Sequence, residues 1–247
     1  MKTKIIYPIK DHKVNQMYDS IVSELGKLAN KNKAKVLSGF FKTGKGQYGE
    51  GDAFLGIKVP DQRKIAKKYK EASFEDIKKL LGNKIHEYRL TGLLILVEQF
   101  NKSDESQRKK IVDFYLDNLK NVNNWDLVDL SADKILGEYL IDKDKSLLKK
   151  MARSKNLWEK RIAIVSTFAF IKQNKVNDTL KISEILISDK HDLIQKAVGW
   201  MLREVGKRDK QAEVSFLKRH HNKIPRTTLR YAIERFPESE RKFFMVK

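Results

Sequence analysis

No proline occurs between Pro60 and Pro225, and this long interval constrains the fold more than any other feature of the sequence. A proline inside a helix removes a hydrogen bond and clashes with the preceding turn, so its absence permits a long run of helices. Apolar residues in this interval recur with helical spacing, and charged residues fall on the opposite faces. The clearest series is Leu90, Leu93, Leu94, Val97 and Phe100. Alternation typical of β-strands is missing, and we therefore predict an all-α fold with short connections.

The predicted helices repeat with a period of 36 residues. Segment 157–163 is similar to segment 193–199, and Leu229 follows after one further period. Segment 85–91, two periods before the first, has the same pattern, in which a polar stretch opens a helix with a small residue in its early turns. A small residue lets two helices pack closely, and this period with two helices per unit is typical of helical solenoids.

We expect one domain over residues 1–247, with N-terminal helices in 1–60 and tandem repeats in 61–247. Segment 43–52 holds four of the twelve glycines, so we predict an exposed loop there and not a helix. Its letters match the G-x-G-x-x-G motif, but a dinucleotide site needs that motif between a strand and a helix. A loop that connects helices or touches a DNA backbone fits the helical surroundings better.

Lysine and arginine number 52 against 32 aspartate and glutamate residues, so the net charge is +20. Such an excess creates a strong positive field, whose usual partner is a polyanion such as nucleic acid. The structural alternative is a solvated, lysine-rich surface that reflects genome composition. Cysteine is absent, which excludes disulfides and thiol chemistry and fits a reducing, cytoplasmic compartment. The basic start lacks an apolar stretch, so we expect no signal peptide, and no window is apolar enough to span a membrane.

Basic residues cluster on several of the predicted repeats, where they could form a stripe that follows a phosphate backbone. The clusters are Arg63-Lys64 with Lys67-Lys68, Arg108-Lys109-Lys110 and Lys149-Lys150 with Arg153, extended by Arg203, Lys207, Arg208, Lys218, Arg219 and Arg226. The five histidines show no metal-ligand spacing, and we expect them to lie on the surface. They are His12, His86, His191, His220 and His221.

The repeat register gathers two indoles, a carboxylate and a guanidinium toward one inner surface. Trp125 and Arg161 occupy equivalent positions, and Asp129 lies one helical turn beyond Trp125 on the same face. Trp200 is equivalent to Ile164 in the same register. Structural alternatives remain open for each residue: the indoles can be core residues, Asp129 can pair with a lysine, and Arg161 can form a surface salt bridge.

Three motifs resemble those of the DNA alkylation repair family of HEAT-like-repeat glycosylases, the AlkD type. They are the segments 125–129, 157–163 and 194–204, in the family's order and at similar separations. The resemblance covers roughly Phe40 to the C-terminus. It implies a right-handed superhelical solenoid of tandem HEAT-like helix pairs. It also implies an activity: hydrolysis of the N-glycosidic bond of cationic N3- and N7-alkylated purines in duplex DNA, as in base excision repair.

The same resemblance assigns roles to individual residues. It makes Asp129 the catalytic carboxylate, with Trp125 and Trp200 flanking the deoxyribose of the lesion. Arg161 is expected to help hold the DNA backbone nearby, and Arg203 to contact phosphate. The reaction needs no metal and no cofactor, the partner is double-stranded DNA with alkylated bases, and we expect a monomer.

The sequence departs from the family pattern near the N-terminus. Simpler members carry a tyrosine where this chain has Phe40, so a hydroxyl contact is lost or is supplied by Tyr48. Some relatives bind DNA without excising bases, so the fold does not guarantee the reaction. The alternative function is a non-catalytic binder of damaged or branched DNA. A third class, a HEAT-type protein-interaction scaffold, leaves the net charge unexplained.

Overall fold

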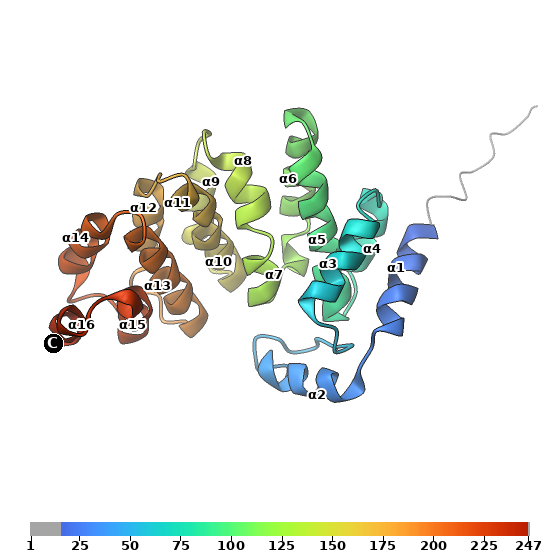
Figure 1. The fold of residues 1–247 in the computed structure, drawn as a ribbon, viewed down its shortest axis with the longest axis horizontal. Helices are drawn as coiled ribbons and strands as arrows, with labels where there is room; N and C mark the ends of the chain where they lie inside the picture. Colours follow the sequence, from blue (N-terminus) through green and yellow to red (C-terminus); the bar gives the residue numbers. More distant parts are fainter. Residues whose placement is uncertain (1–15, 247) are drawn as a thin grey trace, which may run out of the picture. The chain divides into compact units, whose positions relative to one another are not determined.

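The computed structural model describes residues 16–246, which are mainly helical and contain no β-strand apart from an isolated bridge between Ala53 and Ile85 (Figure 1). The predicted all-α class is therefore confirmed. The chain divides into two compact units, Met1–Gln99 and Phe100–Lys247, and we describe each by itself. The single domain and the right-handed solenoid stay predictions. The basic start of the chain and His12 lie outside the described residues.

The first unit is built from helices around an apolar core. Its helices are α1 (Gln16–Lys27), α2 (Lys31–Phe40), α3 (Val59–Lys68), α4 (Phe74–Leu81) and α5 (His86–Lys102), the last of which crosses into the second unit. Helix α1 packs against α3 and α4, and Ile21, Leu25 and Ile77 are fully buried. Helix α4 begins with a capping box in which Ser73 and Asp76 satisfy each other's backbone N–H groups. The apolar series predicted for α5 is buried, as its helical spacing requires.

Segment 43–52 consists of turns, as predicted, and connects α2 with the bridge at Ala53. Gly46 and Gly51 take positive φ angles, a region that favours glycine because it has no Cβ. The segment is mostly exposed, but the Asp52 carboxylate at its end is buried. No strand precedes the G-x-G-x-x-G letters in the described chain, so their context is not that of a dinucleotide site.

Two of the histidines are buried, contrary to the prediction that all lie on the surface. His86 forms a cluster with the rings of Phe41 and Phe54, whose centroids lie 4.9 and 4.7 Å from its own, and its Nδ1 lies 3.2 Å from a carboxylate oxygen of Asp52. His220 lies beneath the surface of α14 (Lys210–His220), with its ring centroid 4.4 Å from that of Phe216. Spacing along the sequence gives no sign of either environment. His191 is exposed and His221 is half-buried.

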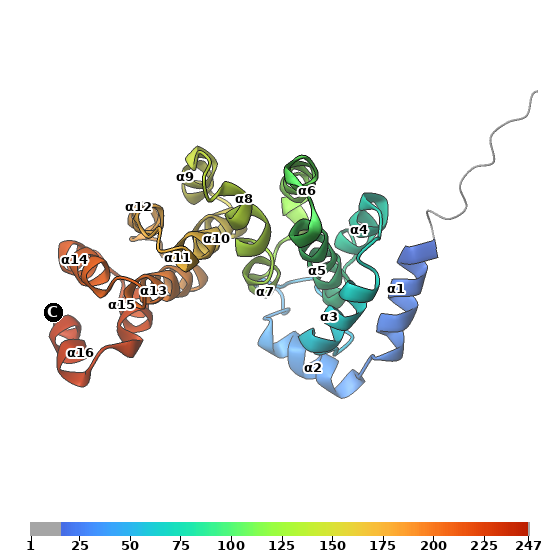
Figure 2. The same cartoon turned by 45° about the horizontal axis from the view of Figure 1, so that its top comes forward.

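The second unit arranges most of its helices in two rows, which are visible in both Figure 1 and Figure 2. The site row, α7, α10, α13 and α15, makes contacts in that order, and the second row consists of α9, α12 and α14. The helices of the unit are α6 (Glu105–Asp117), α7 (Trp125–Asp129), α8 (Glu138–Leu140), α9 (Ser146–Ala152), α10 (Leu157–Ser166), α11 (Phe168–Lys172), α12 (Asn177–Leu186), α13 (Asp192–Gly206), α14 (Lys210–His220), α15 (Arg226–Ala232) and α16 (Glu238–Met245). Helices of the two rows also contact each other, α9 with α10 and both α12 and α14 with α13, and the tandem repeat of two helices stays a prediction.

Small residues allow the close helix packing that the repeat pattern predicts. A Cβ added at Gly199 of α13 would lie 2.5 Å from the carbonyl oxygen of Thr228 in α15. One added at Gly137 would lie 2.3 Å from the carbonyl oxygen of Ser166 in α10. Ala163, at the corresponding position of the preceding repeat, is fully buried. These contacts set the spacing of the site row, because interiors pack with few voids and resist added volume.

The predicted basic clusters of the second unit do not share one row. Lys149 and Lys150 lie on α9, and Lys218 with Arg219 on α14, both in the second row. Arg203, in contrast, lies on α13 of the site row. The basic clusters of this unit are thus distributed over both rows, and the single basic stripe along the repeats stays a prediction.

Candidate functional site

The candidate site is built on α7, a helix of little more than one turn. Its N-cap is Asn124, whose side-chain oxygen accepts a hydrogen bond from the backbone N–H of Trp125 at 2.8 Å. Asp126 in the first turn suits the positive end of the helix. The helix ends at Asp129, and a π-helical turn follows over Asp133–Gly137. Such widened turns are frequent at functional sites.

Asp129 and Arg161 form a buried, bidentate ion pair between α7 and α10. Arg161 Nε donates to Asp129 Oδ1 at 2.9 Å, and Nη2 donates to Oδ2 at 2.8 Å. The Arg161 side chain is 6% exposed, whereas Asp129 keeps 16% of its side-chain surface open to solvent. Parallel N–H···O bonds of this kind fix the orientation of the carboxylate and stabilise its negative charge. The alternatives of a lysine partner for Asp129 and a surface salt bridge for Arg161 are both wrong.

Arg161 is also fixed from its other side. Its Nη1 donates to the backbone carbonyl of Leu193, at the start of α13, at 2.5 Å. All three guanidinium nitrogens therefore have partners within the protein, from α7 and α13. The guanidinium thus joins three helices of the site row at the point where the carboxylate of Asp129 lies.

Burial and charge act on Asp129 in opposite directions. Burial raises the pKa of its carboxyl, because a charged group loses solvation there. The Arg161 guanidinium lowers the pKa and opposes this effect, while the neighbouring carboxylates of Asp126 and Asp133 raise it. The net result is a raised pKa for the Asp129 carboxyl, and Arg161 is the group that limits the rise.

The two predicted indoles lie at different points of the site row. Trp125 is half-buried at the first position of α7, one turn before Asp129. Trp200 is also half-buried, but its ring packs against Phe168 of α11, with centroids 5.8 Å apart. Trp200 lies seven residues beyond Leu193 on α13, which is about 10 Å along a helix axis. The structure thus brings Asp129 and Arg161 together and places Trp200 two turns farther along.

Arg203 is held by acidic neighbours. Its guanidinium forms an ion pair with Glu234, in the short 3₁₀ helix after α15, and lies 3.9 Å from Glu204. Its side chain is 18% exposed. A phosphate that binds Arg203 would therefore have to compete with Glu234, a carboxylate that the motif comparison does not reveal.

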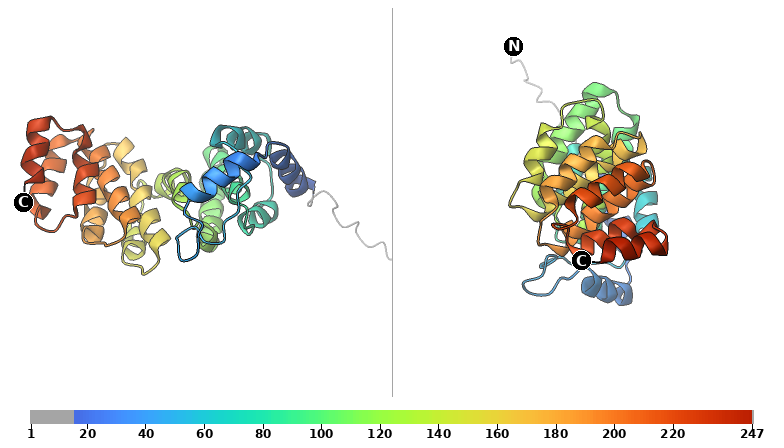
Figure 3. Two further views of the ribbon diagram at one scale, coloured as in Figure 1. Left: turned by 90° about the horizontal axis from the view of Figure 1, so that it is seen from below. Right: turned by 90° about the vertical axis from the view of Figure 1, so that its left-hand side faces the viewer.

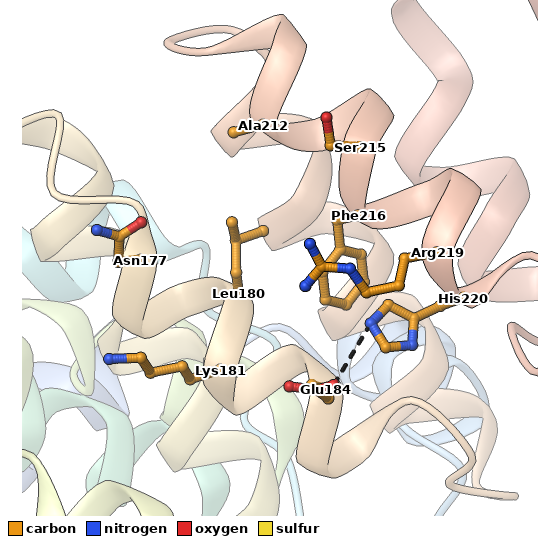
Figure 4. A pocket seen from close by; sticks show the side chains of 9 residues that line it. All are labelled: Asn177, Leu180, Lys181, Glu184, Ala212, Ser215, Phe216, Arg219 and His220. Carbon is orange, nitrogen blue, oxygen red and sulfur yellow. Dashed lines mark ion pairs between the residues drawn. The ribbon is translucent and has the colours of Figure 1, made fainter.

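A separate pocket of about 400 Å³ lies in the second row, between α12 and α14 (Figure 4). Leu180 and Phe216 supply apolar walls, and Glu184 faces His220 at 3.6 Å. The pocket is lined only by residues of α12 and α14, so it is distinct from the site on α7 and α10. Within residues 16–246, no group of three or more His, Asp or Glu side chains is arranged to hold a metal ion.

The comparisons with known proteins agree with this architecture. A family model described as "DNA alkylation repair enzyme" matches residues 21–236. The chain belongs to the DNA alkylation repair enzyme family. A solved structure, a predicted DNA alkylation repair enzyme from Enterococcus faecalis, is similar with a TM-score of 0.66 and 17% sequence identity, over 85% of this chain and 97% of that chain. At this identity the likeness shows the shared fold alone.

A search of the curated proteins finds no match to this member of the DNA alkylation repair enzyme family. None of the helices in the described part of the chain is long and apolar enough to cross a membrane.

Two features of the site could not be predicted from the sequence: the Leu193 carbonyl that holds Arg161 and the Glu234 carboxylate that holds Arg203. The first is a backbone group, which carries no sequence signal.

Proposed function

We propose that this protein is a DNA glycosylase that removes cationic N3- and N7-alkylated purines from duplex DNA. The observation that carries the proposal is the Asp129 carboxylate, held in orientation by Arg161 yet still partly open to solvent. Membership of the DNA alkylation repair enzyme family supplies the class of substrate, damaged DNA. We further propose that it acts as a monomer in the cytoplasm, on the nucleoid.

The chemistry suits a site with one well-placed carboxylate. Alkylation at N3 or N7 leaves a positive charge on the purine, so the base departs with the electrons of the glycosidic bond as a neutral molecule. The deoxyribose then carries oxocarbenium character at C1′, and a nearby carboxylate stabilises that charge. Water adds to C1′ and gives its proton to the carboxylate or to solvent. No group of the lesion has to be protonated for the base to leave.

In this proposal Asp129 is the catalytic residue and Arg161 is a positioning residue. The resemblance assigns Arg161 to the DNA backbone, but its nitrogens are already engaged by Asp129 and the Leu193 carbonyl. Each carboxylate oxygen of Asp129 retains a second lone pair that can face the sugar. Arginine keeps the carboxylate ionised and aimed, which is the state the reaction needs.

Trp125 is proposed to lie beside the deoxyribose, because it shares a helix face with Asp129 and is half-buried. An indole face carries negative charge density that favours a developing cation. Trp200 is proposed to contact the DNA farther along the site row. Arg203 is proposed to bind phosphate after leaving Glu234.

One observation favours the alternative, a non-catalytic binder of damaged or branched DNA. Both oxygens of Asp129 already accept hydrogen bonds, as they would in a purely structural ion pair. The two functions are separated by incubating excess protein with a duplex that carries a single N7-methylguanine and measuring abasic sites. A glycosylase converts the lesion to an abasic site in one turnover, whereas a binder retains the duplex with its lesion intact.

A further inference from the structure

Helix α2 of the first unit carries an uncompensated positive charge. Between Glu24 and Glu50 the sequence contains six lysines and no acidic residue. These lysines are Lys27, Lys31, Lys33, Lys35, Lys42 and Lys45. No ion pair between any of them and another residue of 16–246 is found, whereas lysines of other helices do pair, as Lys68 does with Glu24. Lys27 acts electrostatically on Glu24, and the charges of the other five are directed to solvent or to a partner.

The same helix exposes large apolar side chains. Val36 is 70% exposed and Phe40 is 60% exposed, which makes them the most exposed large apolar residues in the described part of the first unit. They are four residues apart and so share one face of α2. Gly39 lies between them, and a Cβ added there would meet no atom within 4 Å. Val36 and Phe40 thus form an exposed apolar strip with Lys33 beside it, while Lys31 and Lys35 share another exposed face of the helix.

The inner face of α2 is anchored to the unit. Asn30 caps the helix and its backbone N–H donates to the Leu55 carbonyl at 2.7 Å. At the other end, the buried ring of Phe41 stacks on Phe54, with centroids 5.1 Å apart. Figure 3 shows α2 and the loop that follows it along one edge of the first unit. An exposed helix held at both ends presents its outer face in a fixed orientation.

Buried polar groups support this anchorage. The Glu87 carboxylate accepts hydrogen bonds from the backbone N–H groups of Leu55, Gly56 and Ile57 at 2.7–3.2 Å. Gly56 takes a positive φ, and a Cβ there would lie 2.3 Å from the Asn30 carbonyl oxygen, so the segment approaches α2 as closely as backbone allows. Three bonds to one charged acceptor hold the segment on which the first turn of α2 rests.

We propose that the exposed surface of α2, defined by Lys31, Lys33, Lys35, Val36 and Phe40, is a second DNA-binding surface that contacts duplex DNA independently of the lesion. Lysines neutralise backbone phosphates and release counterions. The apolar strip packs against sugars, or inserts at the minor groove, as apolar side chains of DNA-binding proteins do. The choice of DNA as the partner rests on the family membership and on the proposed function. The location of the surface does not rest on them, because α2 lies in a different unit from Asp129.

The test compares two variants that each lose three exposed positive charges from the first unit. The α2 variant is Lys31→Gln/Lys33→Gln/Lys35→Gln. The matched control variant is Lys58→Gln/Lys78→Gln/Lys84→Gln, which changes exposed lysines outside α2 and outside the predicted basic clusters. Binding of the full chain to an undamaged 20-base-pair duplex is measured by fluorescence anisotropy over a range of salt concentrations. We expect the α2 variant to reduce the slope of log K against log salt by about 2–3, since each phosphate contact contributes about 0.9. We expect the control variant to reduce it by less than 1.

Further measurements separate the contribution of the apolar side chains from that of the charges, and DNA from a lipid surface as the partner. Val36→Ser should weaken duplex binding several-fold at every salt concentration without changing the slope, because it removes no charge. Base release at saturating protein should be unchanged in the α2 variant. If wild type releases no base, the glycosylase proposal fails while the comparison of slopes still decides this one. Equal slopes for the two triple variants, or loss of binding to anionic phosphatidylglycerol vesicles with duplex binding retained, would overturn the assignment.

Discussion

Arg161 donates hydrogen bonds to both carboxylate oxygens of Asp129 through Nε and Nη2, while its third nitrogen, Nη1, donates to the backbone carbonyl of Leu193. This relationship ties the proposed catalytic group to the start of α13, 32 residues beyond Arg161 and 64 beyond Asp129 in the sequence. The carboxylate is thus oriented by the packing of three helices. A site of this kind is rigid, as stabilisation of a short-lived cation requires.

The pH dependence of base release should report on this ion pair. Protonated Asp129 cannot stabilise a cation, so the single-turnover rate should fall as pH drops through the pKa of its carboxyl, which burial raises. Arg161→Gln removes the charge that opposes this rise, and the acid limb of the profile should move to higher pH. Arg161→Lys, which keeps a charge but not the two-pronged geometry, should move it less and still slow the reaction by tenfold or more.

The matched control for this profile is Lys160→Gln, the neighbouring cation, which pairs with Asp189 and not with Asp129. Its acid limb should coincide with that of the wild type. An Arg161→Gln profile whose acid limb also coincides with the wild type would show that Arg161 does not set the ionisation of Asp129.

Stability should decline with pH because of a buried glutamate on α14. Burial raises the pKa of Glu213 to about 8 from a usual 4.5, and its side chain lies against Gly206. The folded protein therefore holds a proton that the unfolded chain has lost, and the unfolding free energy falls as pH rises from about 4.5 to about 8. Glu213→Gln should remove this decline and raise stability at pH 9 by on the order of 2 kcal/mol.

Urea denaturation at pH 5 and pH 9 measures the effect, and Glu138→Gln, at an exposed position of α8, serves as the control. The control should leave both unfolding free energies unchanged. A Glu213→Gln variant that is destabilised equally at the two pH values would indicate a neutral packing role and contradict the assigned ionisation.

Glycine at the contact of α13 and α15 should be required for stability. Gly199→Ala places a Cβ 2.5 Å from the Thr228 carbonyl oxygen and from the Cβ of Tyr231, so the helices must separate. We expect a loss of about 1–3 kcal/mol. Gly26→Ala, in α1, meets no atom within 4 Å and should stabilise by about 0.5 kcal/mol because alanine favours helix. Thermal unfolding compares the two, and a Gly199→Ala variant as stable as the wild type would refute the close packing.

The sequence was sufficient for the helical architecture but not for the partners of individual polar groups. Apolar spacing predicted the helical series in segment 90–100, which lies within α5 and is buried, because burial of one helix face determines that pattern. The surface positions predicted for His86 and His220 were wrong. Both rings are buried and face carboxylates, Asp52 and Glu184, that lie more than thirty residues away in the sequence. Polar contacts between distant segments leave no periodic signal in a single sequence.

The candidate site, too, could be predicted from the sequence only in part. The repeat register placed four residues on one surface: Trp125, Asp129, Arg161 and Trp200. The ion pair of Asp129 with Arg161 agrees with it. Its geometry could not be predicted, since it relies on the Leu193 backbone carbonyl. The position of Trp200 against Phe168, two turns farther along α13, also depends on how α11 packs and not on the register alone.

The most direct test of the central claim is single-turnover release of 7-methylguanine from methylated duplex DNA by the wild type, by Asp129→Asn and by Asp113→Asn. The last variant changes an exposed aspartate of α6 and controls for the loss of one charge. We predict release by the wild type and by Asp113→Asn, with the rate of Asp129→Asn reduced by at least a hundredfold while affinity for undamaged duplex is retained. Release by Asp129→Asn at the wild-type rate would contradict the role of this carboxylate, and absence of release from all three proteins would contradict the glycosylase itself.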